Sequence, residues 1–131
     1  GIRPDSINPD LIRQRLGANP LGIQLIQGET YDVMNSCDML IIASGSATLE
    51  AGILGCPMVI VYKLNPLTYW LARLWIKIPF VGLVNIVAGE GVVPELIQHK
   101  VTAENISSEV LAMLRTPEKE QAVPDTFGFA L

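Results

Sequence analysis

Hydroxyl groups, a glycine and one acid are concentrated in a short string of this sequence, ASGSATLE at residues 43–50. Ser44, Ser46 and Thr48 supply hydroxyls, and Gly45 permits a tight turn and the close approach of a ligand to the backbone. The string follows an apolar run typical of a strand and leads into small residues typical of a helix. A helix that starts directly after such a turn favours a phosphate or pyrophosphate, because its free N–H groups and its dipole attract an anion.

Glu50 is an acid in a stretch of otherwise small and apolar residues. If the helix begins near Ala47, we expect Glu50 on its first turn, where the carboxylate can accept two hydrogen bonds from a ribose diol. The string is neither a Walker A loop nor GxGxxG, and it lacks the order of a nucleophile elbow. A purely structural interpretation also fits, since serine and glycine end many strands and an acid complements the dipole of a helix start. On pattern alone both interpretations stay open.

A second candidate surface is the segment Tyr62–Phe80, YKLNPLTYWLARLWIKIPF, which holds five of the eight aromatic residues of the chain. On a helix, Trp70 and Trp75 lie on one broad apolar face, while Arg73 and Lys77 lie on or beside the other. Aromatic residues, an apolar face and unbalanced cations suit a membrane interface or an anionic lipid. A core or interdomain helix with two snorkelling cations explains the pattern equally well.

The composition is apolar for a soluble chain of 131 residues, with 50% hydrophobic and 17% charged residues. That excess predicts a sheet buried on both faces, or a surface meant for another domain or a membrane. The net charge of -4 gives no case for nucleic-acid binding. With one histidine and no CxxC pair, no histidine-based metal site is readable. No metal and no cofactor are expected. Cys37 and Cys56 are expected to be buried free thiols of a reducing compartment.

Strand-like and helix-like segments alternate along the chain, which predicts an α/β fold with a parallel sheet flanked by helices. About three strands are visible where a doubly wound domain has about five or six, so the sheet is expected to be partial. Asn85 lies in an expected extended or irregular segment, where it is either a turn former or a group that recognises a base. Strands are predicted at Gly22–Ile26, Met39–Ala43 and Met58–Tyr62; helices are predicted at Pro9–Leu16, Thr30–Ser36, Ala47–Leu54 (closed by Gly55), Pro66–Lys77, Val93–Gln98 and Thr102–Leu114; and Val81–Val87 is predicted to be extended or irregular.

Several unusual motifs occur in one order between Gly28 and Leu114: ASGSATLE, PMVIVY, PLTYWLA, LVNIVAG and PELIQ. In types and spacing they resemble the C-terminal half of lipid-A-disaccharide synthases, glycosyltransferase family 19. The resemblance implies a GT-B fold, in which two Rossmann-like domains enclose the site. Residues 1–116 would be part of the C-terminal UDP-sugar-binding domain and residues 117–131 a loosely ordered tail, while the N-terminal acceptor domain would be absent.

The resemblance also implies an activity, which is the inverting transfer of 2,3-diacylglucosamine from UDP-2,3-diacylglucosamine to lipid X (2,3-diacylglucosamine 1-phosphate). The products would be lipid A disaccharide 1-phosphate and UDP, formed without a metal. Such enzymes are peripheral proteins at the cytoplasmic face of the inner membrane. The general base would lie in the absent N-terminal domain, so no catalytic residue is assigned and the chain alone is expected to be inactive.

Site residues follow from the motifs that match. Ser44, Gly45, Ser46, Ala47 and Thr48 would form the diphosphate-facing turn. Glu50 would hold the ribose hydroxyls, Asn85 would lie near the nucleotide, and Glu95 and Gln98 are further candidates. The membrane- or lipid-facing residues would be Trp70, Arg73, Trp75 and Lys77. The family has proline where this chain has Val84, which loosens the backbone before Asn85.

Two other functions remain open from the sequence. One is a different GT-B enzyme acting on a UDP-sugar, although PLTYWLAR is not expected there. The other is a non-catalytic half-domain that binds a membrane or a partner subunit. Because an absent domain would leave apolar surface uncovered, the isolated chain is also expected to form homo-oligomers.

Overall fold

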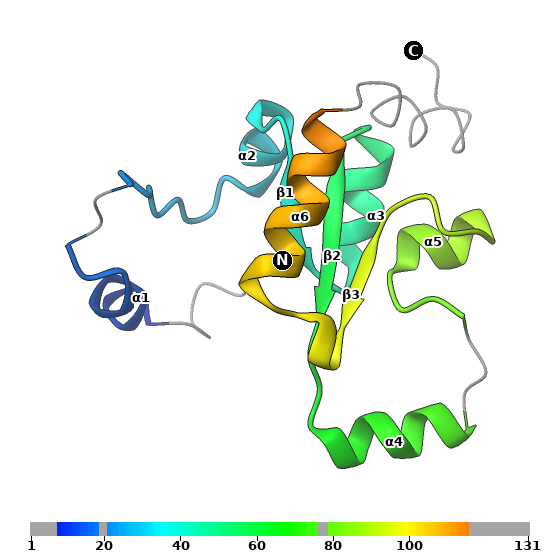
Figure 1. The fold of residues 1–131 in the computed structure, drawn as a ribbon. Helices are drawn as coiled ribbons and strands as arrows, with labels where there is room; N and C mark the ends of the chain where they lie inside the picture. Colours follow the sequence, from blue (N-terminus) through cyan, green and yellow to red (C-terminus); the bar gives the residue numbers. More distant parts are fainter. Residues whose placement is uncertain (1–7, 19–20, 76–78, 116–131) are drawn as a thin grey trace. The chain divides into compact units, whose positions relative to one another are not determined.

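The computed structural model describes residues 8–18, 21–75 and 79–115, with the side chains of residues 72–75 excepted. The chain divides into two compact units, Gly1–Ser36 and Cys37–Leu131. The first unit contains two short helices, α1 (Pro9–Leu16) and α2 (Thr30–Ser36), both at their predicted positions (Figure 1). Asn8 caps α1, because its Oδ1 accepts a hydrogen bond of 2.9 Å from the N–H of Asp10.

The strand predicted at Gly22–Ile26 is wrong, since this segment is neither strand nor helix. Gly22 has a left-handed φ of 65°, which interrupts an extended chain at the start of the segment. The side chains of Ile23, Leu25 and Ile26 are all exposed, so the alternating pattern buries neither face. A strand also needs a neighbouring strand, and the strand pairs of the described residues all lie in the second unit.

The second unit contains a parallel sheet of three strands in the order β1-β2-β3, formed by β1 (Leu40–Ala43), β2 (Met58–Tyr62) and β3 (Glu95–Ile97). The strands predicted from the apolar runs Met39–Ala43 and Met58–Tyr62 are confirmed as β1 and β2. β2 is central, and Met58, Val59 and Ile60 are buried because helices cover both faces. In register, Ala43 pairs with Val61 and Tyr62 pairs with Ile97, so all three strands end at one edge of the sheet.

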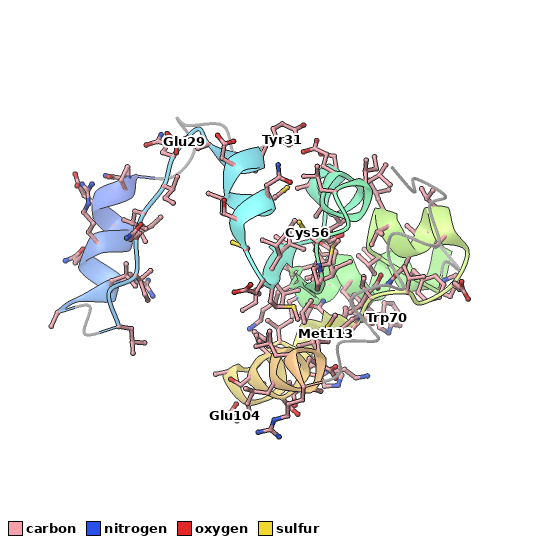
Figure 2. All side chains as sticks on the ribbon, turned by 90° about the horizontal axis from the view of Figure 1, so that it is seen from above. Glu29, Tyr31, Cys56, Trp70, Glu104 and Met113 are labelled. Atoms are coloured by element: carbon pink, nitrogen blue, oxygen red, sulfur yellow. The ribbon has the colours of Figure 1, made fainter. Side chains whose placement is uncertain are left out.

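Helices form a layer on each face of this sheet, with α6 (Ala103–Leu114) on one side and α3 (Ser46–Ile53) and α5 (Leu83–Ala88) on the other (Figure 1). On the α6 side, Val59, Leu96 and Met113 form a buried cluster. Figure 2 shows Met113 between the sheet and α6. Thr102 caps α6, because its Oγ1 accepts a hydrogen bond from the N–H of Asn105.

Two predictions between Val81 and Gln98 are wrong. The segment predicted as extended contains α5, which Gly89 closes with a left-handed φ of 75°. The segment predicted as a helix contains β3, followed by a short 3₁₀ helix (Gln98–Lys100). The cause is tertiary, because the N–H of Ile60 bonds to the carbonyl of Pro94 and Leu96 enters the core.

Candidate functional site

The Ser44–Gly45–Ser46 turn connects the carboxyl end of β1 to the start of α3. Ser44 still belongs to the ladder, since its N–H donates to the carbonyl of Val61 at 3.1 Å. Gly45 is the N-cap, with no side chain to satisfy the helix start. The N–H groups of Ser46 and Ala47 therefore have no acceptor within the helix. A turn of this kind at the carboxyl edge of a parallel sheet is where such folds bind ligands.

The three hydroxyls of the turn have different roles. Ser44 Oγ donates to the carbonyl of Val81 at 3.0 Å. Thr48 is fully buried (0% exposed), and its Oγ1 donates to the carbonyl of Gly45 at 2.7 Å, which tightens the turn. Ser46 is exposed at the first position of α3. Of the three, Ser46 is the hydroxyl that is turned to solvent and able to meet a ligand.

Glu50 lies one residue further into the helix than predicted. Because α3 begins at Ser46, Glu50 is its fifth residue, and the first turn contains no acid. The expectation of a first-turn position is therefore wrong by about one residue. The side chain is half-buried, and it lies four positions after Ser46, on the same face of the helix. The helix start is thus free of negative charge, which favours an anionic ligand.

Asn85 and Glu95 come together in one polar network, in which Asn85 is buried and Glu95 is half-buried. The side-chain amide of Asn85 (0% exposed) donates to the carbonyl of Val93 at 2.9 Å and to Glu95 Oε1 at 2.8 Å. Its Oδ1 accepts from the N–H of Val93 at 3.0 Å. The carboxylate of Glu95 also accepts from the N–H groups of Val81 and Gly82, each at 2.8 Å. Both side chains predicted at the nucleotide site therefore have partners within the protein.

Gln98 follows β3 at the same edge of the sheet as the Ser44 turn, with β2 between them. Its φ of 55° is left-handed, which is uncommon for a residue other than glycine. Its Oε1 accepts from the N–H of Leu64 at 3.0 Å and so holds the chain that leaves β2. Gln98 thereby positions the loop that leads to the next helix.

Sequence reasoning missed Val81, Gly82 and Leu64, whose backbone groups are bonded by predicted site residues. Val81 and Leu64 contribute through backbone atoms, so their residue types give no sign of these contacts. Gly82 carried a signal, because a Cβ at this position would overlap Ile60 Cδ1 and lie 3.0 Å from Glu95 Oε1. A glycine beside a motif indicates such a close approach.

The helix α4 (Pro66–Trp75) carries the segment predicted to face lipid. Asn65 Oδ1 accepts from the N–H of Leu67 at 3.0 Å and caps the helix, with Pro66 at its first position. Leu67 and Trp70 are 67% and 62% exposed, and Leu71 is also exposed. Lys77 lies outside the described residues, as do the side chains of Arg73 and Trp75. No helix within the described ranges is both long and apolar enough to cross a bilayer.

Acidic, histidine and cysteine side chains do not form a cluster of three or more able to hold a metal ion in the part of the chain that the structure describes. Two carboxylates are of interest here, and they belong to different parts of the structure: Glu50 lies on α3, and Glu95 lies in its network with Asn85. The chemistry that the arrangement supports is therefore anion binding by backbone N–H groups, aided by a hydroxyl and by one carboxylate that can accept hydrogen bonds.

Comparison with known proteins places this arrangement in a family. The family model described as lipid-A-disaccharide synthetase matches residues 6–127. The lipid-A-disaccharide synthase of Nitrosococcus oceani is 47% identical over 107 residues, which cover 82% of this chain and 28% of that protein. The synthase of Syntrophus aciditrophicus is 44% identical over 82% of this chain and 28% of its own length. That of Geobacter sulfurreducens is 46% identical over 78% of this chain and 27% of its own length.

The matched regions thus span only about a quarter of the length of these relatives. The α/β fold, with its partial parallel sheet, agrees with part of a Rossmann-like domain of the GT-B type. From the extent of the family match and the identity to these synthases, the chain belongs to the lipid-A-disaccharide synthetase family.

Proposed function

We propose that this chain contains the part of a lipid-A-disaccharide synthase that binds the donor nucleotide, here called the nucleotide half-site. Residues 1–116 would be part of its C-terminal UDP-sugar-binding domain, and an N-terminal domain outside this sequence would carry the acceptor. The tail expected at residues 117–131 lies outside the described residues. The single observation that carries the proposal is the start of α3, where Ser46 and Ala47 have N–H groups without helical acceptors and Glu50 lies one turn further on.

The diphosphate of UDP would bind at the start of α3. Its negative charge is stabilised there by the backbone N–H groups, by the Ser46 hydroxyl and by the positive end of the helix dipole. Glu50 would accept hydrogen bonds from the ribose hydroxyls. Charge grows on the diphosphate as the glycosidic bond breaks, so the same groups would stabilise the leaving group more strongly in the transition state than in the ground state.

The transfer joins the anomeric carbon of the donor 2,3-diacylglucosamine to the 6-hydroxyl of lipid X, with inversion and release of UDP. A base must remove the hydroxyl proton, and we place it in the N-terminal domain. This chain alone would bind the nucleotide without turnover. Asn85, Glu95 and Gln98 would belong to the same nucleotide site.

Both substrates carry acyl chains, so the enzyme must work against a lipid surface. We propose that α4 faces the inner membrane on its cytoplasmic side as part of a peripheral protein. The support is the exposure of Leu67, Trp70 and Leu71 on a helix with no acid among its residues. The same exposed face would let the isolated chain self-associate.

Titration of the chain with UDP, UMP and uridine, followed by NMR of the backbone amides, tests the nucleotide site. UDP should bind in a saturable way and shift the amide signals of Ser46 and Ala47. UMP should bind more weakly because it lacks the β-phosphate, and uridine more weakly still. Equal responses to all three, or shifts confined to other elements, would contradict a diphosphate site at α3.

A further inference from the structure

Glu95 reaches the Ser44 turn through one peptide group. The N–H of Gly82 and the carbonyl of Val81 belong to the same planar amide, and in a trans peptide they point in opposite directions. Glu95 Oε1 accepts from the N–H at 2.8 Å. On the opposite side, the carbonyl accepts from Ser44 Oγ at 3.0 Å. The carboxylate, the amide and the hydroxyl therefore form one continuous hydrogen-bonded chain.

The neighbouring amide is fixed in the same way, because Glu95 Oε2 accepts from the N–H of Val81 at 2.8 Å. Two bonds to consecutive N–H groups determine the direction of the Val81 carbonyl. Hydrogen bonds in such a chain also strengthen one another, since each polarises the next amide. An ionised carboxylate is the strongest acceptor that a side chain can provide here.

Asn85 in turn fixes Glu95. Its amide nitrogen donates to Glu95 Oε1 at 2.8 Å, and the rest of its amide is bonded to both backbone groups of Val93. Because Asn85 is fully buried, this side chain has no alternative partner in solvent. The carboxylate of Glu95 is held in one orientation from behind, and its acceptor sites are directed at Val81 and Gly82.

We propose that Glu95 is a positioning residue for the nucleotide site and acts on UDP only through Val81 and Ser44. By fixing the Ser44 hydroxyl, it orders the turn whose next N–H groups meet the diphosphate. The inference rests on the proposed function, because it names how the same site is preorganised. Asn85 supports Glu95 and likewise has no contact with the nucleotide.

Glu95→Gln is the informative substitution, because it keeps the size of the side chain. Its amide oxygen can serve the Oε1 position, but its NH₂ group then faces the N–H of Val81, so a donor meets a donor. Glu90→Gln is the matched control, because it makes the same chemical change at an exposed position away from the network. Ser44→Ala and the double variant Ser44→Ala/Glu95→Gln complete the set.

The first measurement is amide hydrogen exchange of each variant without nucleotide. Glu95→Gln should speed exchange severalfold at Ser44 and Thr48, whose N–H groups donate to the carbonyls of Val61 and Gly45, whereas Glu90→Gln should leave these amides unchanged. The α6 amides serve as an internal reference that a general loss of stability would also move. Unchanged exchange at the turn in Glu95→Gln overturns the proposal, whether or not UDP binds.

The second measurement is the UDP dissociation constant of the four variants at a temperature where all are folded. Glu95→Gln should raise it roughly fivefold to tenfold, about the effect of one ordinary hydrogen bond. The double variant should lose no more than the worse single variant, because both act on one chain of bonds. Losses that multiply would mean that Glu95 acts on UDP by a route that does not pass through Ser44. No loss would mean that Glu95 does not affect the nucleotide site. Either outcome overturns the proposal. Failure of the unsubstituted chain to bind UDP would instead overturn the proposed function, and the exchange data would still decide the role of Glu95.

Discussion

Ser46 and Glu50 lie four residues apart on α3, so the exposed hydroxyl at the helix start and the half-buried carboxylate one turn later share one face of the helix. The two groups differ in chemistry, because a hydroxyl can donate to a phosphate oxygen while a carboxylate can only accept from a hydroxyl. This order along one helix face matches the order of diphosphate and ribose in UDP. The following predictions derive from it and from the packing around it.

Ser46 and Thr48 should respond in opposite ways to loss of the hydroxyl. Ser46→Ala removes an exposed group, so we expect unchanged stability and UDP binding weaker by roughly tenfold. Thr48→Val removes the buried bond to the Gly45 carbonyl and should lower the free energy of unfolding by about 1 kcal/mol. Urea denaturation and calorimetric titration of both variants measure the two quantities. The reverse pattern would place the ligand contact at Thr48.

Gly82→Ala should destabilise the fold by about 1–3 kcal/mol in urea denaturation, because the new Cβ overlaps Ile60 Cδ1 in a filled core. Ile60→Val is the matched suppressor, since it removes the atom that is overlapped. Alone it should cost about 0.5–1.5 kcal/mol. The double variant should be clearly more stable than the sum of the two single losses predicts. Simple additivity would show that the glycine is needed for another reason.

Cys56 predicts a dependence of stability on alkaline pH. Burial raises the pKa of this thiol above its ordinary value of 9.0, and the nearby Cys37 raises it further. Above pH 9 the unfolded chain loses the thiol proton first, so the free energy of unfolding falls as pH rises toward the folded pKa. Figure 2 shows Cys56 inside the second unit. In denaturation series from neutral pH upward, Cys56→Ala should flatten this decline; an equally steep decline in both proteins would contradict the assignment.

The exposed leucines of α4 should contribute to lipid binding. Leu67→Ser/Leu71→Ser should weaken sedimentation with phosphatidylglycerol vesicles by roughly tenfold, because two apolar side chains no longer enter the interface. Leu111→Ser/Leu114→Ser, on α6, removes two exposed leucines elsewhere and is the matched control. Equal losses in both double variants would show that general apolarity, and not α4, binds the vesicle.

Local patterns predicted the part of the fold around β1, α3 and β2. Unbroken apolar runs specify the two strands, and Gly55, with a φ of 72°, closes the helix between them as a C′ glycine. The same local signals predicted a helix at Ala47–Leu54 that carries Glu50; the helix begins one residue earlier and so includes Ser46. These features depend on neighbours in sequence, which is why the sequence alone reveals them.

The region of α5 and β3 could not be predicted in this way. β3 has only three residues and exists because the edge of β2 offers it hydrogen bonds and Leu96 fills the core. The bonds of Glu95 to Val81 and Gly82 span 14 and 13 residues. A contact of this length has no periodic signature, so Glu95 and Asn85 could be recognised as polar residues of interest but not as partners of each other.

The most direct test of the nucleotide half-site is calorimetric titration of UDP into the unsubstituted chain, into Glu50→Ala and into Glu90→Ala. Glu50→Ala should weaken binding by roughly tenfold or more, because two hydrogen bonds from the ribose to a carboxylate are lost. Glu90→Ala removes the same charge from an exposed position and should bind UDP like the unsubstituted chain. Equal affinities of all three proteins, or no saturable binding by the folded chain, would contradict the assignment of the α3 turn as the UDP site.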